Sequence, residues 1–114
     1  MKKDKIIPVR IKTHKDKTGG HPHIIVEDIE DKHVSVGLST KPKKGKNNPN
    51  YALKSSPLCD GKTSYMRRQG TVAPQKEYYG ERKGRMTQKD YRQAKVYADN
   101  AKQKYLVKKN NKKK

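Results

Sequence analysis

The sequence contains no tryptophan and no phenylalanine, and only 29% of its residues are hydrophobic. Its seven tyrosines and its Ile, Val and Leu residues must therefore supply nearly all the packing of a core. Full disorder is the alternative for so polar a chain. The apolar residues are clustered and periodic, however, which favours a folded protein, and 114 residues are the length of one domain.

Cysteine and long apolar runs are scarce as well. A single cysteine, Cys59, excludes an intramolecular disulfide and gives no zinc-ligand spacing. It lies in the polar stretch "SSPLCDGK", and we interpret it as a thiol without a role, in a reducing compartment. No apolar run reaches a membrane-spanning length, and the N-terminus lacks the apolar region of a signal peptide. We therefore expect a cytoplasmic protein with no membrane partner.

Acidic residues are few, because 11 Asp and Glu face 30 Lys and Arg, and the formal net charge is +19. Residues 21–40 hold four of these acids and one base, so cations flank an acidic segment on both sides. Such a surface attracts polyanions, and Lys and Arg that contact phosphates release counterions. We expect a nucleic acid rather than a membrane surface, because the predicted C-terminal helix has only a small Tyr/Ala face.

Apolar alternation predicts strands in the first third of the chain. Residues 4–12 alternate as an edge strand would, and Pro8, which has no backbone donor, favours an edge. Residues 13–20 contain a glycine pair and are predicted as a turn or short loop. Residues 23–29 and 33–39 are β-rich and separated by a short acidic turn, which predicts a hairpin.

The middle of the chain is mostly polar. Residues 41–63 are rich in Lys, Asn, Pro and Gly and are predicted as a long loop, which in a small domain is usually functional or disordered. Residues 64–73 are predicted as a further strand with Tyr65 and Val72 facing inward. Residues 74–84, "PQKEYYGERKG", are interpreted as a second polar connection.

A helix is predicted over residues 88–106. Thr87 is a natural N-cap, and Asp90 three residues later completes a pair like that of a capping box. One face recurs at three- and four-residue steps: Tyr91, Ala94, Ala98, Ala101 and Tyr105. Residues 108–114 are predicted as a disordered Lys-rich tail. The order of elements predicts an α+β domain over residues 1–107, mainly β, with a small curved sheet or barrel and a C-terminal helix.

Histidines are the first candidates for chemistry, because imidazole is the general acid or base that titrates near neutral pH. His21 and His23 are two residues apart and share one face of an extended strand. Two such histidines could ligate a metal, but nothing in the sequence supplies a third ligand, so we predict no metal and no cofactor. The alternative is that both are exposed polar residues where a strand begins.

Hydroxyls and cations follow the predicted hairpin. Ser39 and Thr40 end its second strand and can bind a phosphate or simply cap the strand. The predicted nucleic-acid contacts are a basic loop and a patch that includes an aromatic ring: Lys41, Lys43, Lys44 and Lys46, then Tyr65, Arg67 and Arg68. Lysines contact phosphates without reading sequence, whereas Tyr and Arg stack on unpaired bases, which favours single-stranded RNA. A solvated, solubilising surface is the alternative for each patch.

The stretch "GGHPHIIVEDIEDKHVSVGLSTKP" resembles the core of the PemK/MazF group of toxin endoribonucleases. These proteins tend to show a basic residue and Pro, an apolar strand, a turn, and an apolar strand that ends in a hydroxyl residue. Here the same order is filled by "HP", "HIIV", "VSVGL" and Ser39–Thr40. The later "GRMTQKDY" is similar to the turn that leads into the last helix of the family. The specific part of the resemblance covers about twenty residues of this chain.

The resemblance implies an SH3-like barrel and metal-independent cleavage of RNA. In that reaction the 2′-hydroxyl attacks the adjacent phosphorus, helped by a base, an acid and positive charge. The implied acid and base are His21 or His23, while Ser39 and Thr40 would hydrogen-bond the phosphate, and Lys41 and Arg68 would supply charge. The family usually has Arg before the Pro, where this chain has His21, which can act as acid, base or cation or can mark a loss of catalysis.

Three functions therefore stay open. The first is a PemK/MazF-like endoribonuclease that cleaves single-stranded RNA, with an acidic protein antitoxin as its inhibitor and a possible homodimer. The second is a basic RNA- or DNA-binding accessory protein of a plasmid or phage, without catalysis. The third is a protein–protein module that binds an acidic partner. Cleavage of single-stranded RNA in EDTA distinguishes the first from the other two.

Overall fold

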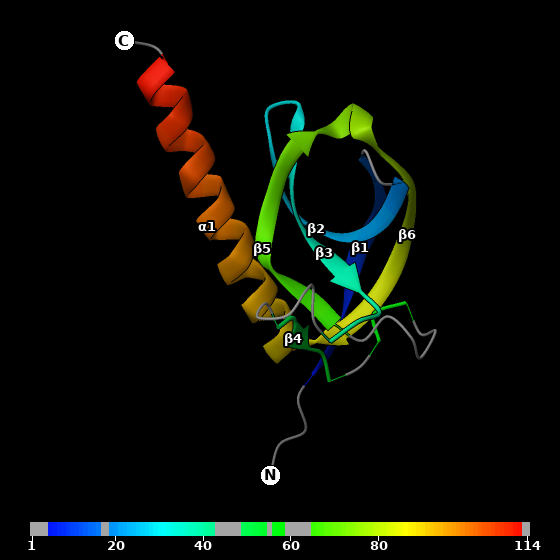
Figure 1. Ribbon diagram of the computed structural model, residues 1–114. Helices are drawn as coiled ribbons and strands as arrows, with labels where there is room; N and C mark the ends of the chain where they lie inside the picture. The colour runs from blue at the N-terminus through cyan, green and yellow to red at the C-terminus, as the bar shows by residue number, and fades with distance from the viewer. Residues whose placement is uncertain (1–4, 17–18, 43–48, 55, 59–64, 113–114) are drawn as a thin grey trace.

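The computed structural model describes residues 5–16, 19–42, 49–54, 56–58 and 65–112. It is mainly β with one C-terminal helix, as predicted (Figure 1). The elements in chain order are β1 (Ile6–Asp16), β2 (Gly19–Ile29), β3 (Lys32–Ser39), β4 (Tyr51–Ala52), β5 (Tyr65–Pro74), the 3-10 helix η1 (Gln75–Glu77), β6 (Tyr78–Thr87) and α1 (Gln88–Lys112). The strands form one antiparallel sheet in the order β4-β5-β3-β2-β1-β6.

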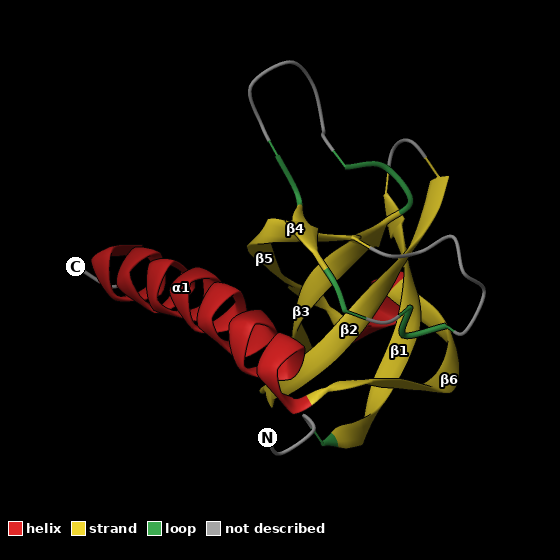
Figure 2. Cartoon of the chain, turned by 90° about the horizontal axis from the view of Figure 1, so that it is seen from below, coloured by secondary structure: helices red, strands yellow, loops and turns green. Residues whose placement is uncertain are grey.

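The sheet is strongly curved, and α1 lies on its outside along β5 (Figures 1 and 2). The predicted hairpin is confirmed, since β2 and β3 pair up to Ile29 and Lys32 and turn at Glu30 and Asp31. Glu30 takes a positive φ of 54° in this two-residue turn. The hairpin contributes the two central strands, so both faces of β3 are covered.

The two faces of β3 have different chemistry. Val34, Val36 and Leu38 point to one side, which we call the helix face, where they join an apolar cluster with residues of α1. His33, Ser35 and Gly37 alternate with them and point to the other side, which we call the histidine face. All six residues are buried. The fold therefore has an apolar core on one side of its central strand and a buried polar cluster on the other.

The first strand is longer and more central than predicted. The expectation of a turn over residues 13–20 is wrong for Thr13–Asp16, which continue β1, and for Gly19 and Gly20, which begin β2. The expectation of an edge strand is also wrong, because β1 pairs with both β2 and β6. Pro8 pairs with Arg85 of β6 and precedes Arg10, where the pairing with β2 begins, so its missing donor leaves no gap in the ladder.

The second polar connection is mostly a strand. Residues 78–87 form β6, an edge strand that pairs only with β1. Five successive residues of β6, Tyr79 to Lys83, are exposed, so the segment shows no apolar alternation. Its ends are anchored instead, since Tyr78 and Met86 are buried. An edge strand exposed over half its length does not carry the pattern that predicts strands.

The predicted loop over residues 41–63 contributes to the core. Within its described part, β4 pairs with β5, and Leu53 and Pro57 are buried. The Pro57 carbonyl accepts a hydrogen bond of 3.0 Å from the Arg85 backbone N–H, which holds this segment against β6. In β5, Tyr65 and Val72 are half-buried, while the fully buried residue is Met66.

The helix begins as predicted and ends later. The Asp90 backbone N–H donates to Thr87 Oγ1 at 3.1 Å, which confirms the N-cap. The Asp90 carboxylate is fully buried and accepts from the Lys54 backbone N–H at 2.8 Å and from the Tyr51 hydroxyl at 3.3 Å. Burial and this carboxylate raise the pKa of Tyr51. The helix continues to Lys112 instead of ending at 106, and residues 113–114 of the predicted tail lie outside the described residues.

The extension of α1 has a physical cause in the hairpin. Lys102 donates to Glu27 of β2 at 2.8 Å, and Lys109 is paired with Glu30 in the turn. The Lys32 ammonium also lies 5.9 Å from the centre of the Tyr105 ring. These contacts hold the C-terminal half of α1 against the hairpin. The acidic turn noted in the sequence thus pairs with the basic end of the helix.

Candidate functional site

The histidine face contains three buried histidines, and His33 is the most enclosed. The Lys12 ammonium has only donors, so it donates to His33 Nε2 across 3.0 Å. The ring proton is therefore on Nδ1, which donates to Asp28 Oδ1 at 2.5 Å. Both nitrogens of His33 are occupied, and this residue ties β1, β2 and β3 together.

His23 has a different kind of partner. Its Nδ1 lies 3.0 Å from Ser35 Oγ, and Ser35 Oγ lies 2.8 Å from the Tyr78 hydroxyl. Burial raises the pKa of Tyr78, against the lowering effect of its hydrogen bond to Ser35, so the phenol keeps its proton. When Tyr78 donates to Ser35 and Ser35 donates to His23 Nδ1, every hydroxyl proton has an acceptor. This arrangement leaves the ring proton of His23 on Nε2.

His14 completes the cluster from β1. Its Nε2 donates to Glu77 Oε1 at 2.9 Å, and its ring lies 4.6 Å from that of Tyr78 and 5.1 Å from that of His23, centre to centre. In the sheet register His14 is the partner of His21, which is half-buried. The alternative of exposed polar residues is therefore wrong for His23, which is 5% exposed, whereas His21 is half-buried.

Gly37 brings His23 and Arg67 together. A Cβ atom at Gly37 would lie 3.3 Å from Arg67 Cδ and 3.4 Å from His23 Cε1 and Nε2. Both side chains therefore lie over the same bare stretch of β3, where a larger residue would displace them. The position combines a proton donor and acceptor with a permanent positive charge in a partly buried place, which is the combination that phosphoryl chemistry uses.

The hydroxyl pair at the end of β3 is split. The Ser39 hydroxyl accepts from the Lys41 backbone N–H at 3.1 Å and so caps the strand end. Thr40 and Lys41 are exposed just beyond it. Tyr65 is the register partner of Ser39 and is half-buried at the same end of the sheet. The predicted contacts Lys43, Lys44 and Lys46 lie outside the described residues.

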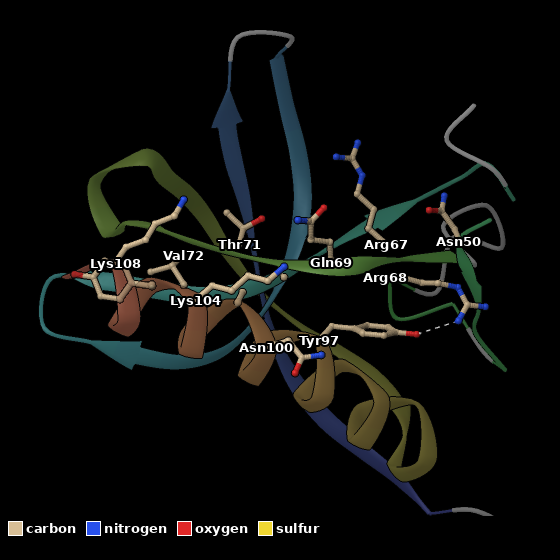
Figure 3. A pocket seen from close by; sticks show the side chains of 13 residues that line it. Asn50, Arg67, Arg68, Gln69, Thr71, Val72, Tyr97, Asn100, Lys104 and Lys108 are labelled. Atoms are coloured by element: carbon tan, nitrogen blue, oxygen red, sulfur yellow. Dashed lines mark hydrogen bonds between the residues drawn. The ribbon is translucent and has the colours of Figure 1, made fainter. Parts of the chain in front are cut away.

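Arg67 and Arg68 point to opposite faces of β5, as neighbouring strand residues must. Arg68 donates to the Pro49 carbonyl at 3.2 Å and to the Tyr97 hydroxyl at 3.4 Å, and its guanidinium lies 5.9 Å from the centre of the Tyr51 ring. Figure 3 shows the two arginines turned apart. The two arginines thus leave β5 on opposite faces, although both line one groove between β5 and α1. Arg67 is the arginine beside His23.

A groove runs between β5 and α1, with a volume of about 730 Å³. Arg67 and Arg68 lie at one end and Lys104 and Lys108 line its α1 side (Figure 3). Its base is closed by direct contact of the helix with the strand, because a Cβ at Gly70 would lie 2.7 Å from the Tyr97 carbonyl oxygen.

No family model, curated protein or solved structure matches this chain. Among the described residues, no group of three His, Cys, Asp or Glu side chains is placed to hold a metal ion. In the same part of the chain, α1 is not apolar enough to cross a membrane.

Three parts of the site were missed by sequence reasoning. Ser35 and Tyr78 were not candidates, although the alternation of β3 places Ser35 on the face of His33 and Gly37. Tyr78 carries no local signal, because it reaches Ser35 from a segment that looks like a connection. Lys104 and Lys108 fall in a lysine-rich helix end, where the sequence alone does not distinguish a lysine that lines a groove from one that is paired.

Proposed function

We propose that this protein is an endoribonuclease of the PemK/MazF type, the toxin of a toxin–antitoxin system, which cleaves single-stranded RNA without a metal. The observation that carries the proposal is the approach of His23 and Arg67 over Gly37. The resemblance of residues 19–42 to that family supports the reaction type. The curved sheet with its C-terminal helix fits the fold that the resemblance implies.

In the proposed reaction, His21 takes the proton of a 2′-hydroxyl, and the oxygen attacks the adjacent phosphorus. The bond from phosphorus to the 5′-oxygen breaks, and His23, which reacts as an imidazolium, gives its Nε2 proton to that oxygen and becomes neutral, while His21 becomes the imidazolium. Arg67 stabilises the negative charge on the phosphoryl oxygens. The products are a 2′,3′-cyclic phosphate and a 5′-hydroxyl, so atoms and charge balance without a co-reactant.

The surrounding residues have supporting roles in this proposal. Ser35 and Tyr78 orient the His23 ring: in the imidazolium form Nδ1 donates to Ser35 Oγ, and Ser35 donates to the Tyr78 hydroxyl. Thr40 donates a hydrogen bond to the phosphate, and Lys41 adds positive charge beside it. Ser39 keeps the turn in place through the Lys41 backbone. Arg68, which lies on the other face, contributes to binding rather than to the reaction.

The test is incubation with a mixed-sequence single-stranded RNA in EDTA. Wild type should release 2′,3′-cyclic ends, and His21→Ala and His23→Gln should each cleave about 100- to 10,000-fold more slowly, the range of general acid–base catalysis. Circular dichroism of each variant establishes that the fold is retained. Absence of cleavage by the wild type would contradict the proposal, and cleavage at the wild-type rate by either variant would remove that histidine from the mechanism.

Binding of nucleic acid without cleavage is the second candidate. It is favoured by the groove between β5 and α1, which carries positive charge but no acid–base pair. The replacement of the family's arginine by His21 also fits this function. Salt-sensitive binding of the same RNA with no cyclic ends would be its signature.

A further inference from the structure

The groove between β5 and α1 is lined mostly by residues that have no part in the proposed reaction. Its polar lining consists of cations, amides and hydroxyl groups: Arg67, Arg68, Lys104, Lys108, Asn50, Gln69, Asn100, Thr71, Tyr97 and Tyr105. Among the described residues, no carboxylate lines it. Figure 3 shows Lys104 and Lys108 extending from α1 towards the β5 side chains Gln69 and Thr71. The groove is thus open to an anion.

The lysines of α1 fall into two groups. Lys102 and Lys109 are paired with Glu27 and Glu30 on the hairpin, and these pairs raise the pKa of both lysines. Lys104 and Lys108 line the groove one helical turn apart and have no carboxylate partner among the described residues. The helix therefore uses one pair of lysines to attach itself to the sheet and presents the other pair to a ligand.

The size and composition of the groove favour a flexible strand. A volume of about 730 Å³ lies in the range of pockets that enclose small ligands, so it suits a few nucleotides rather than the width of a duplex. Asn50, Gln69 and Asn100 can pair with the edges of unstacked bases, and the half-buried ring of Tyr105 offers a surface beside them. Cations and amides in this mixture recognise a phosphate backbone with exposed bases.

We infer that this groove binds a single strand of RNA, with Lys104, Lys108 and Arg67 in contact with successive phosphates. The inference rests on the proposed function for the identity of the strand. Arg67 lines the groove and also lies over Gly37 beside His23. A strand in the groove therefore leads directly to the proposed site of cleavage.

The experiment compares two double variants of one helix. Lys104→Gln/Lys108→Gln removes the cations of the groove, and Lys102→Gln/Lys109→Gln removes the same charge from the paired lysines. The probe is a fluorescein-labelled 2′-O-methyl oligouridine of twelve nucleotides, which has no free 2′-hydroxyl and cannot be cleaved. Fluorescence anisotropy at several salt concentrations gives the affinity and its salt dependence.

The groove variant should bind at least about tenfold more weakly at low salt, and its log–log salt slope should fall by about 1.4, or about 0.7 for each lost phosphate contact. The control variant should stay within about threefold of wild type, because its lysines make no phosphate contact. Equal losses in the two variants would overturn the inference. Tight binding of poly-glutamate that depends on Lys104 and Lys108, without binding of the oligonucleotide, would overturn it in favour of an acidic protein partner.

Failure of this inference and failure of the proposed reaction can be told apart. The probe reports binding whether or not the protein cleaves RNA, because it has no attacking hydroxyl. If the groove variant loses binding and the wild type does not cleave RNA, the binding role of the groove is supported and the proposed nuclease reaction is contradicted. If the wild type cleaves RNA but the groove variant binds the probe as tightly as wild type, the reaction is supported and the binding role of the groove is contradicted.

Discussion

The two faces of β3 are equally buried but are stabilised in different ways. On the helix face, Val34 and Val36 are fully buried in an apolar cluster, where each stabilises the fold roughly in proportion to its buried area. On the histidine face, His33 and Ser35 are also buried, but they are held by directed hydrogen bonds beside a small apolar cluster of Ile25, Ala73 and Tyr78. A protein with so few apolar residues thus places polar groups where a second apolar core would normally lie.

The difference indicates where function can sit. Apolar packing has no direction and tolerates small shifts, whereas a buried hydrogen bond fixes orientation and is costly to leave unmade. The helix face therefore holds α1 on the sheet, and the histidine face holds imidazoles in chosen tautomers. Each prediction below separates these two contributions.

The largest expected effect is at Gly70 of β5, which lies against α1 on the helix face. In Gly70→Ala the new Cβ would lie 2.7 Å from the Tyr97 carbonyl oxygen and 3.0 Å from Ala98 Cα, and neither backbone atom can move without moving α1. We expect a loss of about 3 kcal/mol in the free energy of unfolding, measured by urea denaturation.

Gly37→Ala is the matched control on the histidine face. The atoms nearest to the added Cβ belong to the side chains of Arg67, at 3.3 Å, and His23, at 3.4 Å. Side chains can shift more easily than backbone. The loss of stability should be below about 1 kcal/mol, while cleavage of RNA should slow because the two groups are pushed apart. Equal destabilisation by the two substitutions would contradict the contrast between the faces.

Adjacent residues of β3 give the next effect. Val36→Ala removes two buried methyl groups and should lower the free energy of unfolding by about 2 kcal/mol, with an unchanged rate of cleavage per folded molecule. Ser35→Ala leaves the Tyr78 hydroxyl and His23 Nδ1 without their partner and should cost about 1–2 kcal/mol. It should also slow cleavage about ten- to a hundredfold, because His23 is no longer oriented.

Single-turnover kinetics beside urea denaturation separates the two variants. If Val36→Ala lost cleavage per folded molecule while Ser35→Ala kept it, the assignment of the two faces would be reversed. Tyr78→Phe removes the hydroxyl that is hydrogen-bonded to Ser35. It should lower the free energy of unfolding and the rate of cleavage as Ser35→Ala does, but by smaller amounts.

The smallest effect concerns the exposed rim of the histidine face. Hydrogen bonding to Arg10 lowers the pKa of Glu81, so this carboxylate stabilises the folded protein when it is charged. The contribution is fully present above the unfolded value near 4.5 and is lost as the pH falls through the lower folded-state value. Between about pH 6 and pH 3, wild type should lose slightly more stability than Glu81→Gln, as thermal denaturation would record.

The sequence was sufficient where the signal is local. Thr87 and Asp90 lie three residues apart, so the start of α1 could be predicted, and the alternation of residues 33–39 predicted β3 with its two faces. The histidine face could not be predicted as buried, because its cover comes from Tyr78, 43 residues beyond Ser35. The end of α1 was also missed, since the ion pairs of Lys102 and Lys109 reach the hairpin across more than 70 residues of sequence.

In the candidate site, too, residue types could be read from the sequence, but their spatial arrangement could not. His23 and Arg67 were both candidates by residue type, but the role of Gly37 between them depends on the register of three strands. Arg68 was preferred to Arg67 because sequence proximity does not tell which of two neighbouring residues faces the histidines. The faces could be assigned only after β5 was placed beside β3.

The most direct test is the single-turnover rate of cleavage of a single-stranded RNA in EDTA, at saturating protein, by wild type, Arg67→Gln and Arg92→Gln. Arg92 is exposed on α1 and does not line the groove, so its variant is the control for a lost guanidinium. We predict 2′,3′-cyclic ends from wild type, a rate at least about 100-fold lower for Arg67→Gln, and an unchanged rate for Arg92→Gln. A wild type that does not cleave, or an Arg67→Gln that cleaves at the wild-type rate, would contradict the account.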